Sequence, residues 1–412
     1  MRILIIGEGG RESALAAKLQ NDPRISKMFF ANGNATTDVI GKNVHLSEIK
    51  ELRDFAIKEK IDLTIVGPEA PLVAGLKDEF KKHDLKVFGP NQKVASLEGS
   101  KAFSKKFMQT YDIKTAKAVV FDSYNDAKEY VQTQQYPLVI KASGLAGGKG
   151  VVICDNLEEA EATIHDFMIR RIYGDAGIRL VIEEYLEGFE ASIIAFSNGE
   201  KIFPCIAAKD YKKAGNGDTG PNTGGMGSVA PSPDFTQEHY ADFEKNILQT
   251  TINGLKGEGF SFKGIIFFGL MVTKNGTYLL EYNMRFGDPE TQVLMALMEN
   301  NLLDVIQDCM EGKDIQLKFK DEKAVCLVMC SGGYPRNIET GYEIVGEDKL
   351  KHSKLLYAGA VRKADKVVSN GGRVLNIVAT GATYDDARKK VYEDASHIHF
   401  DYGFYREDIG KF

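Results

Sequence analysis

Short apolar runs alternate with amphipathic stretches over the first hundred residues. The runs are typical of buried strands, and the stretches between them repeat apolar residues every three or four positions, as helices do. The predicted strands are 2–6, 27–31, 61–66 and 86–88, and the predicted helices are 10–20, 47–59 and 72–82. Because strands that alternate with helices favour right-handed crossovers, we expect a parallel sheet.

A second unit is predicted to begin near Ser100, which suits the N-cap of a helix starting at Lys101. Its strands follow one another with hairpin-like connections, so this part should be largely antiparallel. The predicted strands are 117–121, 137–142, 151–154, 179–185, 191–197, 202–208, 263–273 and 277–283, with a helix at 156–170. The polar stretch 209–233 is rich in glycine and predicts a functional or disordered loop.

A third unit is predicted from about residue 323. Its strands lie near 324–331, 355–361, 366–369 and 372–379, and a helix lies near 383–395. The sequence therefore predicts an α/β and α+β multidomain chain. It would have an N-terminal parallel α/β domain at 1–100, a central domain at 101–312 and a small mixed β domain at 323–412.

Composition and charge narrow the class of protein. The 412 residues suggest two to four domains, and no stretch approaches the roughly 18 apolar residues of a membrane span. The formal net charge of −6 disfavours nucleic acid as a partner, since phosphate backbones bind clustered Lys and Arg. The run at 2–6 enters a glycine turn directly and does not resemble a signal peptide.

Five cysteines are scattered through apolar runs, and only Cys326 and Cys330 lie close together in the sequence. With no second pair or histidine partner, free buried thiols are favoured over a zinc site. We expect a cytoplasmic protein.

A glycine turn at 7–12 follows the first predicted strand and opens a helix. Its backbone amides could approach a phosphate at the positive end of that helix, and Arg11 could grip the phosphate. A dinucleotide fingerprint would have glycine where Glu12 stands, so a nicotinamide site is disfavoured. The alternative is a turn that merely packs a helix against a strand.

A second glycine segment, 144–150, follows the predicted strand that ends near Lys141 and contains Lys149. Such a loop can fold over a triphosphate and bring a cation to the charge that develops during transfer. It lacks the P-loop pattern. A solvated hairpin with two exposed lysines is the alternative.

The stretch 183–186 ends a strand, where backbone groups suit the edge of an adenine, and Glu190 could accept ribose hydroxyls. This signal is weak, because glutamates are common at the edges of sheets.

Glu281 and Asn283 are two residues apart on a predicted strand and so share a face, with Arg285 just beyond. A carboxylate and an amide oxygen are suitable ligands for Mg²⁺, whose remaining positions go to water and phosphate. Arg285 would then face a transferring phosphoryl group. The alternative is a polar outer face, although Asn is depleted in strands.

The segment 217–227 has glycines that free backbone amides for a phosphorylated or polyhydroxyl ligand. A flexible surface loop is the alternative.

Together these features resemble the ATP-grasp superfamily, and their order resembles its phosphoribosylamine–glycine ligase family. The resemblance spans the whole chain. The matching stretches are GEGGRE at 7–12, DLTIVGPEAPLVAGL at 62–76, LEGSKAF at 97–103, GLAGGKGV at 144–151, GPNTGGMG at 220–227, EYNMRFGDPETQ at 281–292 and NGGRVL at 370–375.

The resemblance implies ATP-driven joining of glycine to 5-phosphoribosylamine in purine synthesis, through glycyl phosphate, with release of ADP and phosphate. It implies ATP and Mg²⁺ as cofactors, with Mn²⁺ as an alternative cation. It also implies a mobile lid at about 115–187 and an ATP-grasp fold for the central domain. We expect no nucleic-acid or membrane partner, and a monomer.

The resemblance also implies roles for individual residues. Contacts with ATP would come from Lys101, Lys141, Gly147, Gly148, Lys149, Gly150, Glu183, Glu184, Tyr185, Leu186 and Glu190. The cation would be held by Glu281 and Asn283, and catalysis would involve Arg285, Lys149 and Asp210. The substrates would be held by Gly9, Gly10, Arg11, Glu12, Pro68, Glu69, Asn222, Thr223, Gly224, Gly225, Met226, Gly227, Asp288, Pro289 and Glu290.

The chain departs from the family pattern at Glu8, Ser13, Ser143 and Tyr211. A carboxylate at position 8 would repel a phosphate, so Glu8 should point away or pair with a base. Two other functions stay open at this point. One is a different ATP-grasp enzyme, such as a biotin-carboxylase-like or formate-using one, and the other is a non-catalytic nucleotide-binding regulator.

Overall fold

The computed structural model describes residues 1–412. Its N-terminal part contains a five-stranded sheet in the order β3-β2-β1-β4-β5, and every neighbouring pair is parallel, as predicted. The strands are β1 (Arg2–Gly7), β2 (Lys27–Asn32), β3 (Lys42–Val44), β4 (Leu63–Val66) and β5 (Val87–Phe88). The helices are α1 (Gly10–Leu19), α2 (Ala35–Ile40), α3 (Ile49–Lys58), α4 (Glu69–Val73), α5 (Leu76–Lys81) and α6 (Gln92–Gly99).

One predicted helix in this part was wrong. The stretch 72–82 is divided between α4 and α5, because Gly75 has a left-handed backbone with φ of +90°. This conformation ends one helix and lets the chain start the next in a new direction.

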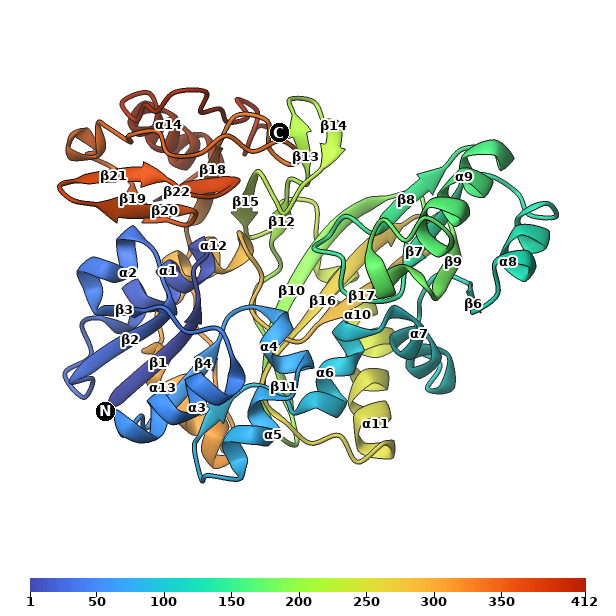
Figure 1. Ribbon diagram of the computed structural model, residues 1–412, viewed down its shortest axis with the longest axis horizontal. Coiled ribbons are helices and arrows are strands. Elements are labelled where there is room, and N and C mark those ends of the chain that lie inside the picture. Colours follow the sequence, from blue (N-terminus) through green and yellow to red (C-terminus); the bar gives the residue numbers. More distant parts are fainter.

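The central part has two antiparallel four-stranded sheets, as its hairpin-like connections predicted. One has the order β11-β10-β16-β17, and the other has the order β6-β9-β7-β8. The second sheet and its helices α8 and α9 project at the right of Figure 1.

The first sheet contains β10 (Phe189–Asn198), β11 (Ile202–Pro204), β16 (Lys263–Thr273) and β17 (Gly276–Asn283). The second contains β6 (Ala118–Phe121), β7 (Leu138–Ala142), β8 (Val151–Cys154) and β9 (Leu180–Glu184). The helices are α7 (Lys101–Thr110), α8 (Tyr124–Val131), α9 (Leu157–Met168), η1 (Gly174–Gly177), α10 (Gln237–Phe243), η2 (Glu244–Leu248), α11 (Gln249–Gly257), α12 (Glu290–Leu297) and α13 (Leu302–Glu311). Ser100 caps α7, as predicted, by accepting a hydrogen bond from Phe103 N.

The segment 209–233, predicted to be a loop, is largely structured. It forms β12 (Lys209–Asp210), the hairpin β13 (Lys213–Gly215) and β14 (Thr219–Asn222), and β15 (Gly227–Ala230). The prediction missed these strands because each has only two to four residues. β15 pairs with β12 on one side and with a C-terminal strand on the other.

The C-terminal sheet has the order β12-β15-β18-β22-β19 and is antiparallel throughout. The predicted strand 355–361 is wrong as a single element, since the chain turns at 358–359 and β20 pairs with β21 instead. The elements are β18 (Lys323–Cys330), η3 (Glu347–Lys349), β19 (Lys354–Tyr357), β20 (Ala360–Lys363), β21 (Lys366–Ser369), β22 (Arg373–Gly381) and α14 (Tyr384–Ala395).

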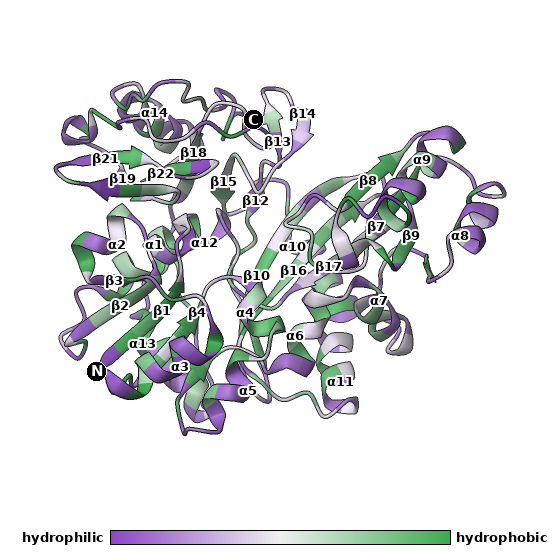
Figure 2. Cartoon of the chain, in the orientation of Figure 1, coloured by the Kyte–Doolittle hydropathy of each residue, from purple (hydrophilic) through white to green (hydrophobic).

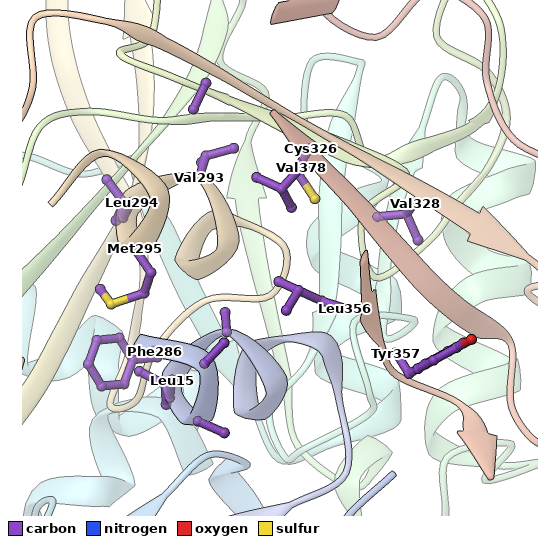
Figure 3. Packing of buried hydrophobic residues seen from close by; sticks show 14 of the residues in the cluster. Leu15, Phe286, Val293, Leu294, Met295, Cys326, Val328, Leu356, Tyr357 and Val378 are labelled. Atoms are coloured by element: carbon purple, nitrogen blue, oxygen red, sulfur yellow. The ribbon is translucent and has the colours of Figure 1, made fainter. Parts of the chain in front are cut away.

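The largest hydrophobic cluster joins the N-terminal part to the C-terminal sheet. Figure 3 shows Leu15 of α1 beside Phe286, with Met295 of α12 and Leu356 of β19 around them. The strands are predominantly hydrophobic and the outer helices mixed or hydrophilic, as Figure 2 shows. The five cysteines are free and buried, as expected. No helix has the length and apolar character needed to span a membrane.

Candidate active site

Glu281 and Asn283 lie two residues apart on β17, so their side chains share a face of the strand. Burial disfavours the ionised carboxylate, yet the pKa of Glu281 is lowered because Lys101, Lys212 and other cations lie nearby. No group of three or more His, Cys, Asp and Glu side chains is placed to hold a metal ion by itself. An ionised carboxylate beside an amide oxygen fits a hard divalent cation that completes its shell with water and phosphate.

Arg285 follows the strand, and its guanidinium is held on several sides. Nη2 donates to Asn283 Oδ1 at 3.0 Å, and Nη1 donates to the Phe286 carbonyl at 3.2 Å. Two carboxylates of the N-terminal part also reach it. Glu98 lies 3.0 Å from Nη2, and Glu69 lies 3.5 Å from Nε.

Lys141 is the last residue but one of β7 and is buried. Its Nζ lies 2.8 Å from Glu183 Oε2, while Lys105 Nζ lies 3.1 Å from the other oxygen of the same carboxylate. Lys141 also acts electrostatically on Glu281. The structure therefore brings the end of β7 and the end of β17 together, which the sequence hypothesis requires.

Ser143, one of the departures from the family pattern, connects these elements. Its carbonyl accepts from Lys101 N at 2.7 Å, and its hydroxyl accepts from Ala102 N at 3.1 Å. Ser143 thus holds the start of α7 against the end of β7, and this places Lys101 beside the same site.

The glycine loop 144–150 has a different character. Gly147, Gly148 and Lys149 are exposed, and added Cβ atoms on the two glycines would meet nothing within 4 Å. Lys149 forms no ion pair, while its carbonyl accepts from Tyr173 Oη at 2.8 Å. The loop is therefore anchored through its backbone, and the ammonium group is free.

The residues predicted to hold the nucleoside lie at the end of β9 and the start of β10. The Glu183 side chain faces the buried lysines, so only its backbone could reach an adenine. Glu184 Oε1 accepts from Lys117 N at 2.8 Å, and Tyr185 is 42 % exposed. Glu190 forms an ion pair with Lys212, a cation that the sequence reasoning left without a role.

The glycine turn at the start of α1 is braced from within. Glu12 is fully buried, and its carboxylate accepts from Gly9 N at 2.7 Å and from Arg11 Nε at 2.6 Å. Arg11 also donates to the Phe286 carbonyl at 3.0 Å. Glu12 was predicted to contact substrate; the structure places it beneath the turn, where its charge satisfies donors of the protein itself.

Two departures in this region have clear structural consequences. Glu8 is exposed and makes no ion pair, so it is not paired with a base. Ser13 is buried; its hydroxyl donates to the Tyr357 carbonyl at 2.6 Å and accepts from Asn34 Nδ2 at 2.8 Å. Ser13 therefore joins α1 to the C-terminal sheet.

The segment 222–227 is held by two residues that sequence reasoning missed. Gly224 N donates to Tyr334 Oη at 2.9 Å, and Arg373 Nη1 donates to the Gly224 carbonyl at 2.7 Å. Arg373 also donates to the Asp288 carbonyl at 2.6 Å. The only sequence signal for either residue was the NGGRVL stretch at 370–375, which contains Arg373. Met226 is fully buried and packs in the core, so the predicted substrate contact could come only from its backbone.

Asp210, Gly225 and Pro289 meet at one point. Gly225 has φ of +114°, and a Cβ there would lie 2.5 Å from Pro289 Cδ and 2.7 Å from Asp210 Oδ1. That carboxylate oxygen is buried and has no hydrogen-bond partner. Burial and the nearby Glu290 raise the pKa of Asp210, and burial raises that of Glu290. A buried acceptor without a donor suits a cationic ligand group.

Asp288 remains ionised in the same region. Burial opposes its charge, but the guanidinium groups of Arg373 and Arg11 lower the pKa of Asp288. It accepts from Arg11 N at 3.3 Å and from Gln292 Nε2 at 2.8 Å. Both carboxylate oxygens of Asp288 are thus used by the protein, so this residue offers little free charge to a ligand.

Three family models match the chain. They are described as the N domain of phosphoribosylglycinamide synthetase at residues 1–98, its ATP-grasp (A) domain at 99–291 and its C domain at 324–412. The chain belongs to the phosphoribosylglycinamide synthetase family. As a member of that family it is an ATP-grasp ligase, and a merely regulatory nucleotide-binding protein is disfavoured because the charged groups of the site are intact.

Relatives of this family match over the full length. A phosphoribosylamine–glycine ligase of Clostridium acetobutylicum is 48% identical, and the match covers 100% of this chain and 100% of that protein. The crystal structure of phosphoribosylamine–glycine ligase from Thermotoga maritima has a TM-score of 0.86 at 34% identity, covering 99% of this chain and 100% of that one. The biotin carboxylase domain of a 2-oxoglutarate carboxylase from Hydrogenobacter thermophilus shares the fold, with a TM-score of 0.76 at 14% identity, covering 97% and 90%.

Proposed function

We propose that this enzyme joins glycine to 5-phosphoribosylamine, using ATP, to form glycinamide ribonucleotide in purine synthesis. A carboxylate is a poor electrophile, and ATP removes this obstacle. A carboxylate oxygen of glycine attacks the γ-phosphorus, and the bond to the bridging oxygen breaks, so that ADP leaves and glycyl phosphate forms. The ribosylamine nitrogen then attacks the acyl carbon, phosphate leaves, and the nitrogen loses a proton.

One observation carries the proposal beyond family membership. The ionised Glu281, the cation Arg285 and the buried Lys141 lie at the ends of β17 and β7, and the nearby Asp210 has a buried carboxylate oxygen without a hydrogen-bond partner. Phosphoryl transfer needs positive charge around the γ-phosphate. An amino-acid substrate needs a partner for its ammonium group. The arrangement supplies both requirements side by side.

We assign the phosphates of ATP to Lys101, Lys141 and the glycine loop with Lys149. Glu281 and Asn283 would hold the divalent cation, which supplies charge neutralisation at the phosphates when bound. We favour Mg²⁺ because the donors are a carboxylate and an amide oxygen, although Mn²⁺ accepts the same donors. Adenine would lie against the backbone of 183–186.

The ribose hydroxyls of ATP are assigned to Glu190. Burial opposes the charge on its partner Lys212, but Glu190, Glu281 and Asp210 together raise the pKa of that lysine. Lys212 therefore stays protonated near Glu281 and Asp210, and it is a further candidate for contact with phosphate.

Glycine is assigned to the pocket where Asp210, Gly225 and Pro289 meet, with Glu290 nearby. The Asp210 carboxylate would accept the ammonium group, which orients the glycine carboxylate toward β17. Phosphoribosylamine is assigned to the turn at Gly9 and Gly10, to Arg11, to Pro68 and Glu69, and to the backbone of 222–227. Tyr334 and Arg373 would keep that last segment in shape.

We also propose three domains, at 1–100, 101–312 and 323–412, with residues of about 115–187 acting as a lid that closes over ATP. The enzyme would work as a monomer in the cytoplasm. The lid assignment rests on the second antiparallel sheet, which projects from the rest of the structure (Figure 1). A closing lid would exclude water from glycyl phosphate, which would otherwise be hydrolysed.

The test is an ADP-release assay with freshly made phosphoribosylamine, in which glycine, bicarbonate and formate are offered in separate arms. The proposal predicts turnover with glycine and formation of a product that contains both glycine and the ribosyl phosphate. ADP release with bicarbonate or formate alone would assign the chain to a different ATP-grasp reaction. An arm without phosphoribosylamine measures wasteful hydrolysis of the acyl phosphate.

A further inference from the structure

Glu98 is a buried carboxylate at the end of α6, and none of the roles above includes it. Only 6% of its side chain is exposed. Its Oε2 accepts from Met284 N at 2.6 Å, and its Oε1 lies 3.0 Å from Arg285 Nη2. Both oxygens are therefore directed at two consecutive residues that follow the strand with Glu281 and Asn283.

Glu98 and Glu69 do not hold Arg285 equally well. Glu69 lies on α4, which packs against α6, and reaches Arg285 Nε only at 3.5 Å. Arg285 Nε has no hydrogen-bond partner, whereas Nη2 has both Asn283 Oδ1 and Glu98 beside it. Glu98 also accepts a hydrogen bond from the backbone N–H of Met284, the residue before Arg285. It therefore constrains the backbone from which the arginine side chain extends as well as the position of its guanidinium.

We infer that Glu98 is a positioning residue for phosphoryl transfer, which holds the Arg285 guanidinium and the backbone at Met284 in the orientation that the transferring phosphoryl group requires. This inference rests on the proposed role of Arg285. A long arginine side chain has considerable rotamer freedom, and a charge-assisted hydrogen bond to a buried carboxylate removes much of it before the substrate arrives.

The cost of placing a carboxylate here supports a functional reason for it. Burial raises the pKa of Glu98 to about 7, and the neighbouring Glu69 and Glu281 add to the rise, against the attraction of Arg285 and the Met284 N–H. A buried apolar residue would avoid this cost. Perturbed carboxylates of this kind concentrate at functional sites.

The place of Glu98 in the chain gives it a second connection to the site. It lies three residues before Lys101, which is assigned to the phosphates of ATP, and it is the last residue but one of α6, which α7 follows. One short segment therefore positions a cation from α7 and, through Glu98, the cation that follows β17. The two cations come from distant parts of the sequence and would act on the same triphosphate.

The experiment compares Glu98→Gln, Arg285→Lys and the double variant in the ADP-release assay. The amide keeps the shape of the side chain and an acceptor for Met284 N, but it removes the charge that fixes the guanidinium. We expect kcat of Glu98→Gln to fall by about 10- to 100-fold, since small misplacements of a catalytic group have effects of that size. The KM for ATP and for glycine should stay within about threefold, because the contact acts in the transition state.

The double variant separates positioning from a general structural role. If Glu98 acts through Arg285, the double variant should be no slower than Arg285→Lys alone, whereas independent effects would multiply. Glu98→Asp keeps the charge one methylene further from the guanidinium and should lie between wild type and Glu98→Gln. It also serves if Glu98→Gln folds poorly.

Glu79→Gln is the matched control. Glu79 pairs with Arg53 and Lys82 in the N-terminal part, away from the site, so its loss removes ion pairs without touching Arg285. It should leave kcat unchanged.

Wild-type kcat in both Glu98 variants, or multiplying losses in the double variant, would overturn the inference. If Arg285→Lys is impaired and Glu98→Gln is fully active, the positioning role of Glu98 is rejected and the proposed role of Arg285 stands. A fully active Arg285→Lys would reject the proposed role of Arg285 and the inference with it.

Discussion

The two sides of the proposed nucleotide site differ in how much of their charge is already paired within the protein. Around β17 and the end of β7, the charged groups are buried and matched: Arg285 has two carboxylates, and Lys141 has Glu183. On the glycine loop, Lys149 is exposed and unpaired. Both sides are assigned to the same triphosphate.

This difference indicates a division of labour. Groups held by buried partners are preorganised and cost no reorganisation when charge develops in the transition state. A free lysine on an exposed loop has to be ordered by its ligand, and part of the binding energy is lost in doing so. The buried side should therefore influence both stability and catalysis, whereas the loop should influence catalysis alone.

The largest effect is expected from Glu281→Ala, which removes the proposed carboxylate ligand of the cation on the buried side. Loss of metal-based charge stabilisation should lower kcat by about a thousandfold or more. The circular dichroism spectrum should stay native. Isothermal titration of the ligand-free proteins with MgADP should show weaker binding to Glu281→Ala than to the wild-type enzyme. Near-normal turnover would mean that the cation is held elsewhere.

Lys141→Met tests the buried side of the comparison. It removes a phosphate contact and also leaves Glu183 with Lys105 as its remaining cation. We expect kcat/KM for ATP to fall by about 10²- to 10³-fold, and the free energy of unfolding to drop by about 1–3 kcal/mol. Urea unfolding measures the second quantity. Lost activity with unchanged stability would show that the pair with Glu183 contributes nothing to the fold.

Lys149→Met is the matched change on the exposed side. Activity should fall by about 10- to 100-fold, because a cation that acts late in the reaction is lost. The melting temperature should not change, since the ammonium group makes no contact in the protein. A clear fall in melting temperature would contradict the distinction between the two lysines.

The smallest expected effect concerns pH and the glycine pocket. Burial and Glu290 raise the pKa of Asp210 above its ordinary value of about 4. As pH falls through this raised pKa, the carboxyl becomes neutral and should bind the glycine ammonium less well. KM for glycine should therefore rise by up to about tenfold per pH unit below it, while KM for ATP changes little. Asp210→Asn should raise KM at all pH values and remove this pH dependence.

Much of the fold was predictable because local patterns determine it. Alternating runs and helical stretches predicted the parallel N-terminal sheet, and hairpin spacing predicted the antiparallel sheets of the central part. Predictions failed where local signals were short. The helix 72–82 is divided at Gly75, and within 209–233 the strand β15 pairs with β18 at 323–330, a partner that no local pattern reveals.

The candidate site divides in the same way. Spacing on one strand was enough to place Glu281, Asn283 and Arg285 together, because residues two apart share a face. It could not indicate that Glu12 and Met226 are buried, since burial depends on what packs against them.

The sequence by itself thus determined the types of chemistry available: a pair of oxygen ligands, lysines near glycines, and a polar segment with free amides. Only the tertiary structure decided which charges neutralise one another. Glu98, Lys105, Tyr334 and Arg373 acquire their partners across separations of more than 70 residues along the chain. An ion pair depends on distance in space and on exclusion of water, and neither is a property of a local stretch of sequence.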